Sequence, residues 1–268
     1  MNPLSDLHLH TTFCDGKSTP REMIEQAISL GYHSLGICCH SPLPFENSWT
    51  VRNEDAFKAE INLLKKEYEG RISISLGIEC DGESDVPHGY DYVIASTHHL
   101  CKNGTVYPID EGKVTFRQAL TEGFGGDEDA FCKAYFEAVV QNVKRLKAQV
   151  IGHFDLIKKY AEADPLCALD EAALFFYGKA ALRELIDCSA ALEVNTGAMA
   201  RGLRKIPYPH KELLLFWREL GGKVILTSDA HRKETLGFAF EQTLSFLREL
   251  GFHSVLELCD GKLRSIIL

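Results

Sequence analysis

The chain has 268 residues, of which 45% are hydrophobic and 25% are charged, which suffices for one well-buried core and not for two. We therefore expect a single domain spanning residues 1–268. The formal net charge of −9 argues against a nucleic-acid partner, because a surface that binds nucleic acid needs basic residues to displace counterions.

Short β-like runs alternate with amphipathic helical stretches along the chain, which is the pattern of parallel strands joined by helices. The expected strands lie near residues 6–10, 34–39, 72–79, 92–97, 150–153, 191–195 and 224–228. Seven such units favour a closed α/β barrel, and an open doubly wound sheet is the alternative. No Gly-x-Gly-x-x-Gly motif follows a strand, which argues against the dinucleotide-binding version of that sheet.

The first expected helix begins after Thr19, which is a good N-cap residue and is followed by Pro20 and Glu22 in the first turn. Gly31 ends this helix. Further helices are expected over residues 53–69, 127–147, 170–188, 210–220 and 241–250. The glycine-rich stretch at about 101–126 shows little periodicity and is expected to be a long loop or lid inserted into the domain. A plain solvated insertion is the alternative.

Residue types that bind metal ions occur where nearly every expected strand ends. The first strand ends in His8-Leu9-His10, and alternation along a strand points both imidazoles to the same side. The loop after it holds Asp15, and later strands run into His40, Glu79, His98-His99, His153 and Asp229-Ala230-His231. Because the carboxyl ends of parallel barrel strands converge on one face, we expect these side chains to form one cluster.

Mixed imidazole and carboxylate ligands suit Zn, Mn or Fe, and a carboxylate such as Glu79 or Asp229 can bridge two ions. Two or three divalent metal ions are therefore the expected cofactors. A local cluster of metal ions also reverses the electric field inside a pocket, so the acidity of the chain is compatible with a small phosphorylated substrate.

The ordered set of residues resembles the polymerase and histidinol phosphatase (PHP) family over nearly the whole chain. Members of this family hold two or three metal ions in a distorted seven-stranded β/α barrel, at the carboxyl ends of the strands. The resemblance implies nine ligands: His8, His10, Asp15, His40, Glu79, His98, His153, Asp229 and His231. Some family members carry histidine where Asp15 stands. His98 and His99 compete for one ligand position; we choose His98, which is nearer the strand, and His99 is then expected to face substrate.

Within the family, the resemblance is greatest to the branch that hydrolyses L-histidinol phosphate. It is carried by the segments 107–110 and 152–160 and by the long insertion. This branch implies a metal-dependent phosphomonoesterase that releases L-histidinol and inorganic phosphate in L-histidine biosynthesis, by attack of a metal-bridging hydroxide. No protein nucleophile is then needed, and the chain has no Gly-x-Ser-x-Gly motif.

The resemblance also indicates which residues bind the substrate. Arg201, Lys158 and Lys159 correspond to the cations that grip the phosphate, although the lysines could equally lie on a solvated surface. Arg204 and Lys205 are expected at the surface. Asp15, Asp229 or His99 would assist the leaving alcohol, and Glu83, Asp85 or Asp155 would pair with the cationic end of the substrate.

Two other functions stay open. The first keeps the chemistry but acts on nucleotides or oligonucleotide ends, and the net acidity counts against it. The second is a binding or regulatory module with structural metal, and the nine ligands count against it because structural zinc sites usually close with four. The sequence does not indicate the oligomeric state.

The sequence also suggests where the protein resides. The longest apolar runs are far shorter than the roughly 20 residues that span a bilayer, so no membrane partner is expected. The first residues, Met1–Asp6, show neither the basic nor the apolar part of a targeting segment, which predicts a cytoplasmic location. Nine cysteines without a Cys-x-x-Cys motif are expected to be reduced core thiols.

Overall fold

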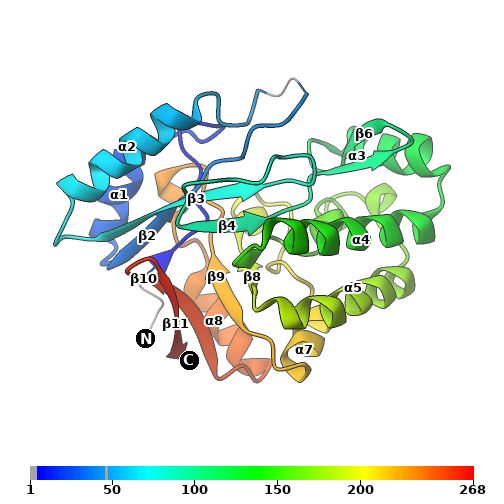
Figure 1. Ribbon diagram of the computed structural model, residues 1–268. Coiled ribbons are helices and arrows are strands. Elements are labelled where there is room, and N and C mark those ends of the chain that lie inside the picture. Colours follow the sequence, from blue (N-terminus) through cyan, green and yellow to red (C-terminus); the bar gives the residue numbers. More distant parts are fainter. Residues whose placement is uncertain (1–4, 46–47) are drawn as a thin grey trace.

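The computed structural model describes residues 5–45 and 48–268. Residues 1–4, on which much of the targeting prediction rests, lie outside the described residues. Seven parallel strands neighbour one another in chain order, and helices lie on their outer side (Figure 1). These strands are β1 (Ser5–Asp6), β2 (Ser34–Ile37), β3 (Ser73–Cys80), β4 (Tyr92–Ala95), β7 (Val150–Ile151), β8 (Ala191–Asn195) and β9 (Val224–Thr227). All seven expected strands are present, and most end earlier than expected.

The chain just after β1 and the chain just after β9 are linked to each other. Just beyond the two strands, Leu9 forms a parallel bridge with Ala230, and the His10 N–H donates to the Ala230 carbonyl at 2.9 Å. The buried Asp6 carboxylate accepts the Ser228 N–H at 3.1 Å. These links close the sheet into the expected distorted barrel. The uninterrupted strand order excludes the doubly wound alternative, in which the order reverses at the middle of the sheet.

All six expected helices are present on the outside of the barrel. They are α1 (Pro20–Ser29), α2 (Glu54–Glu67), α4 (Glu128–Leu146), α5 (Glu171–Leu185), α7 (Lys211–Glu219) and α8 (Phe240–Glu249). At the start of α1 the Thr19 side chain accepts the Glu22 N–H, and the Glu22 carboxylate accepts the Thr19 N–H. This reciprocal capping satisfies two backbone donors that a helix start leaves free. No helix of the described residues is long and apolar enough to cross a membrane.

Two β-hairpins were not expected. Strand β5 (His99–Lys102) pairs with β6 (Thr105–Pro108), and β10 (Ser254–Cys259) pairs with β11 (Lys262–Ile267). The stretch 101–126 is therefore not an irregular loop, because it also holds helix α3 (Lys113–Gln118) and a π-helical turn (Ala119–Gly123). Its role as a lid stays a prediction.

The barrel interior is filled around the ring of Tyr92. Its hydroxyl donates to the Leu7 carbonyl at 2.5 Å, across the barrel from β4. A Cβ atom on Gly77 would lie 2.1 Å from the Tyr92 ring, and one on Gly36 would lie 2.4 Å from its hydroxyl. The two glycines therefore provide the space that this ring occupies.

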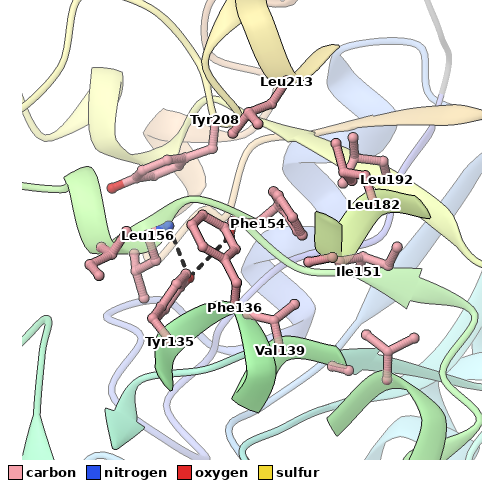
Figure 2. Close-up of a cluster of buried hydrophobic side chains, with 14 of the residues drawn as sticks. Tyr135, Phe136, Val139, Ile151, Phe154, Leu156, Leu182, Leu192, Tyr208 and Leu213 are labelled. Carbon is pink, nitrogen blue, oxygen red and sulfur yellow. Dashed lines mark hydrogen bonds between the residues drawn. The ribbon is translucent and has the colours of Figure 1, made fainter. Parts of the chain in front are cut away.

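A second core lies between the barrel and helices α4 and α5. Figure 2 shows Tyr135 and Phe136 of α4 packed against Phe154 and Leu156, which follow β7. The Tyr135 hydroxyl donates to the Phe154 carbonyl and accepts the Leu156 N–H, both at 3.1 Å. This packing fixes the chain on the carboxyl side of His153.

All nine cysteines are free thiols. Five are buried, as expected: Cys38, Cys39, Cys80, Cys132 and Cys167. Three are partly buried, and Cys101, in the β5–β6 hairpin, is exposed. The expectation of core thiols therefore fails for Cys101.

Candidate metal centre

The nine side chains expected to bind metal gather in one cluster at the carboxyl ends of the barrel strands. Glu79, at the end of β3, lies at its centre and is almost completely buried. Its Oε2 atom is 3.2 Å from His8 Nε2, 3.4 Å from His10 Nε2 and 2.9 Å from His40 Nδ1. Its Oε1 atom is 2.9 Å from His153 Nε2 and 3.5 Å from His98 Nε2. The two oxygens of one carboxylate thus face different histidines.

Asp229, just after β9, forms a second link within the cluster. Its Oδ1 atom lies 3.4 Å from His10 Nε2, 3.8 Å from His8 Nε2 and 3.5 Å from His231 Nδ1. Its Oδ2 atom accepts a hydrogen bond from Arg201 at 3.1 Å. Asp229 therefore joins the histidine cluster to one of the cations expected to bind phosphate.

Asp15 and His231 form the outer edge of the cluster. Asp15 Oδ2 lies 3.2 Å from His231 Nε2, and its Oδ1 lies 3.8 Å from His40 Nε2 and 3.9 Å from His10 Nδ1. The His10 ring stacks against the rings of His40 and His231, with a centroid distance of 4.2 Å to each. The loop after the first strand and the loop after the last thus meet at one point.

Neighbouring charges shift the pKa values of the histidines and carboxylates in the cluster. Burial alone would raise the pKa of Glu79, but the neighbouring histidines outweigh it and hold this pKa well below its usual range. Burial alone would lower the pKa of His98, but Glu79 outweighs it and raises the pKa to about 9. Arg201 and His8 likewise overcome burial and lower the pKa of Asp229. The carboxylates are therefore anionic at neutral pH.

The cluster fits divalent metal ions. Several buried polar atoms lie close to one another but form no well-aligned hydrogen bond among the described residues. Leaving them so is costly unless another group satisfies them. They include His8 Nε2, His10 Nε2, Asp15 Oδ1, His40 Nδ1 and Glu79 Oε2. One group with ligand atoms within 4.8 Å of one another is formed by His10, Asp15, His40 and His231, and a second by His40, Glu79 and His98. Imidazole and carboxylate donors at such spacing suit zinc, manganese or iron.

Two buried carboxylates that support the cluster were missed by the sequence analysis. Glu193, inside β8, accepts from His8 Nδ1 at 2.5 Å and from the His153 N–H at 2.5 Å. Asp81, two residues beyond Glu79, contacts the rings of His98 and His99. Burial alone would raise the pKa of Asp81, but hydrogen bonds from these two rings lower it well below its usual range.

A cavity of about 670 Å³ opens above the cluster and is lined by residues from several strand ends. Arg201 and Lys159 line it. The Lys159 ammonium donates to Asp110 Oδ2 at 3.0 Å and to the Asp110 carbonyl at 2.9 Å. Burial alone would raise the pKa of Asp110, but Lys159 outweighs it and lowers the pKa to about 2.

Lys158 lies elsewhere, contrary to the sequence prediction. It is not among the residues that line the cavity; instead it pairs with Glu171 at 3.2 Å and lies over the Phe175 ring. Lys158 is the last residue of a 3-10 turn (Leu156–Lys158) and Lys159 caps it, and adjacent side chains on such a turn point in different directions. Only one of the two can therefore face the cavity.

His99 also lies outside the cavity lining, although it was expected to face substrate. Its ring stacks on Trp49 with centroids 5.8 Å apart and an interplanar angle of 7°, while the His98 ring faces Glu79. The geometry therefore favours His98 as the ligand of the pair.

The three acidic residues expected to pair with the cationic end of the substrate do not line the cavity. Asp155 is fully buried and lies 3.6 Å from Arg204, which is itself buried rather than at the surface. Arg204 is held inside because its guanidinium also lies 4.2 Å above the Tyr208 ring. Glu83 and Asp85 do not line the cavity, whose acidic residues outside the histidine cluster are Asp110 and Glu111.

The closed β/α barrel and the buried histidine–carboxylate cluster at its carboxyl end define a barrel protein with a candidate multi-metal centre. The chain belongs to the PHP domain family, whose model matches residues 6–197.

Curated relatives match along most of their length. The "Probable histidinol-phosphatase" of Deinococcus radiodurans is 28% identical over 269 residues, which cover 95% of this chain and 96% of that protein. The histidinol-phosphatase of Bacillus subtilis is 24% identical, over 89% of this chain and 97% of that protein.

A solved structure shares the fold. The histidinol phosphate phosphatase of Lactococcus lactis, solved with zinc, L-histidinol and phosphate, superposes with a TM-score of 0.73 at 21% identity. The match covers 97% of this chain and 98% of that one.

Proposed function

We propose that the protein is a metal-dependent phosphomonoesterase that hydrolyses L-histidinol phosphate to L-histidinol and inorganic phosphate. The observation that carries the proposal is the Glu79 carboxylate, whose two oxygens face separate sets of histidines next to a cavity lined by Arg201 and Lys159. The full-length relatives named histidinol-phosphatase support the choice of substrate. The expected cytoplasmic location and single-domain organisation remain proposals.

The histidines and carboxylates of the cluster would hold two or three divalent ions, with zinc, manganese and iron as candidates. Ions bound there supply a water of lowered pKa as nucleophile and compensate the charge of the phosphoryl group. Glu79 would bridge two ions, because each of its oxygens is directed to different histidines. His98, rather than His99, would complete the set.

The phosphate would bind beneath Arg201 and Lys159. The Arg201 guanidinium is held by Asp229, so it enters the cavity from the metal side with its remaining N–H groups directed to an anion. Lys159 is held by Asp110 and adds a second positive charge. Both cations are fixed before substrate arrives, which reduces the entropy lost on binding.

The cationic end of the substrate would lie toward Asp110 and Glu111, which the β5–β6 hairpin brings to the cavity wall. Asp110 already compensates Lys159, whereas Glu111 has no ion pair among the residues that the structure describes. Of the residues expected to assist the leaving alcohol, Asp15 and Asp229 line the cavity, whereas His99 is turned away. Because the pKa values of both carboxyl groups are lowered, they would assist as hydrogen-bond acceptors and not as proton donors.

The experiment is phosphate release by zinc- or manganese-loaded protein from L-histidinol phosphate, a nucleoside monophosphate and a short 5′-phosphorylated oligonucleotide, each over a range of concentrations. We expect kcat/KM to be highest for L-histidinol phosphate. Higher values for the nucleotide substrates would reject this substrate and favour the nucleotide-directed alternative. No phosphate release from any of the three, with metal bound, would favour a binding module.

A further inference from the structure

The carboxylate of Asp81 is fully used as a hydrogen-bond acceptor beside the metal centre. Its Oδ2 atom accepts the His98 backbone N–H at 2.9 Å and lies 3.1 Å from His98 Nδ1 and 3.0 Å from His99 Nδ1. Its Oδ1 atom accepts the Gly82 N–H at 2.6 Å. Only 3% of the residue surface is exposed, so water contributes little to these contacts.

The two adjacent histidines use this shared contact differently. An imidazole that donates from Nδ1 carries its lone pair on Nε2. His98 Nε2 lies on the cluster side, 3.5 Å from Glu79 Oε1. The His99 ring instead stacks on Trp49, which lines the cavity and packs edge-on against His40 at 4.5 Å. Asp81 thus contacts both His98, which belongs to the histidine cluster, and His99, which stacks on Trp49 at the cavity wall.

We propose that Asp81 is a positioning residue that holds His98 with its proton on Nδ1 and its Nε2 free for a metal ion. Through His99, the same carboxylate fixes the Trp49 wall of the substrate cavity. The proposal rests on the metal-dependent activity proposed above, but it does not depend on which phosphate ester is the substrate. It also explains why two adjacent histidines, His98 and His99, have different roles that the sequence alone does not distinguish.

Only a carboxylate satisfies this arrangement. Asparagine has nearly the same shape, but one oxygen becomes an NH2 group, which is a donor. If the NH2 group took the position of Oδ2, it would face the His98 backbone N–H and would force the ring protons of the two histidines from Nδ1 to Nε2. If it took the position of Oδ1, it would face the Gly82 N–H. Either orientation leaves a buried donor without an acceptor, which disturbs the His98 ring.

The first test measures zinc affinity of the Asp81→Asn protein by competition with a chromophoric chelator. We expect zinc to bind roughly 10- to 100-fold more weakly at one site, which is the usual effect of removing a carboxylate that orients a histidine ligand. The matched control is Asp91→Asn, because Asp91 accepts the Leu76 N–H at 2.7 Å at the amino end of β4. The control should keep wild-type zinc affinity. Unchanged zinc affinity in Asp81→Asn would overturn the proposal.

The second test does not need the Asp81→Asn protein, so it tests the proposal even if that variant does not fold. Nitrogen-15 NMR of zinc-loaded, histidine-labelled protein reports the protonated ring nitrogen, and His98→Gln and His99→Gln proteins assign the signals. We expect Nδ1–H for both histidines, and loss of one zinc only in His98→Gln. An Nε2–H form of His98 or His99 would overturn the proposal. Neither measurement uses substrate, so failure of L-histidinol phosphate as substrate would leave these outcomes unaffected.

Discussion

At the scale of single residues, we expect Glu79 to determine how many ions the cluster holds. Its oxygens face His8, His10 and His40 on one side and His98 and His153 on the other. Replacing one oxygen by an amide NH2 group in Glu79→Gln removes a ligand and places a donor among the histidines.

We expect Glu79→Gln to lose at least one bound ion per chain and nearly all activity, measured by elemental analysis of protein dialysed against zinc. Glu83→Gln, an exposed neighbour, is the control and should keep the wild-type metal content. A full complement of metal in Glu79→Gln would show that the carboxylate is not a bridge.

The two adjacent lysines provide a second residue-scale prediction. Lys159 lines the cavity and is held by Asp110, whereas Lys158 pairs with Glu171 outside it. Because a charge-assisted hydrogen bond is worth about 1.5–3 kcal/mol, Lys159→Ala should lower kcat/KM for the phosphate ester roughly 10- to 150-fold. Lys158→Ala should leave kcat/KM close to wild type. Steady-state phosphate release measures both, and a larger effect for Lys158→Ala would contradict the assignment.

The clustering of the nine histidines and carboxylates could be predicted from the sequence because these residues recur at strand ends. The supporting residues are harder to predict, since Glu193 lies within an apolar strand and Asp81 looks like an ordinary turn residue. A charged side chain inside a buried strand is itself a signal, because such residues are rarely buried without a partner. The sequence does not reveal which of two adjacent side chains turns inward, so Lys158 and His99 were misplaced.

At the scale of secondary-structure elements, the start of α7 is sensitive to pH. The His210 Nδ1 atom accepts the Glu212 N–H at 3.3 Å and so caps the helix. Burial, together with the nearby cations Lys158 and Arg204, lowers the pKa of His210, although Asp155 and Glu171 oppose this. The native state therefore binds this proton more weakly than the unfolded state, whose ordinary pKa is 6.5. The resulting stability is present above pH 6.5 and is lost as the pH falls through the lower folded-state pKa.

We expect His210→Asn to remove this part of the acid sensitivity, because asparagine caps a helix and does not titrate. The melting temperature should fall less between about pH 7.5 and about pH 5 in the variant than in the wild type, as measured by circular dichroism. His33→Asn, at a histidine 39% exposed in its side chain, is the control and should retain the wild-type difference. Equal differences in all three proteins would contradict the prediction.

The helices were predictable because each combines a capping residue with an apolar periodicity of about 3.6 residues. The two hairpins were missed although each has a strong local signal. Asn103-Gly104 and Asp260-Gly261 all adopt positive φ, as the two-residue turns of a hairpin require. In the stretch 101–126 the glycines suggest a loop, but Gly104 belongs to such a turn.

At the scale of the whole molecule, the metal centre depends on a barrel narrow enough to bring β1, β3 and β9 together. That width is set inside the barrel, where the Tyr92 ring occupies the space left by Gly77 and Gly36. The links from Asp6 to Ser228 and from Leu9 to Ala230 close the ring above it. The sequence predicted seven strands, but closure depends on contacts between residues at opposite ends of the chain, which periodicity does not encode.

Gly77→Ala tests this dependence. The new Cβ would lie 2.1 Å from the Tyr92 ring, and moving the ring away would break its hydrogen bond to the Leu7 carbonyl. Overpacking of this kind costs about 1–3 kcal/mol, so the melting temperature should fall by several degrees. Gly112→Ala is the matched control, because its Cβ would have no neighbour closer than 3.7 Å. Zinc affinity should fall together with stability in Gly77→Ala, since widening the barrel separates Glu79 from His8 and Asp229. Lower stability with unchanged zinc affinity would show that the loops, and not the barrel width, hold the cluster together.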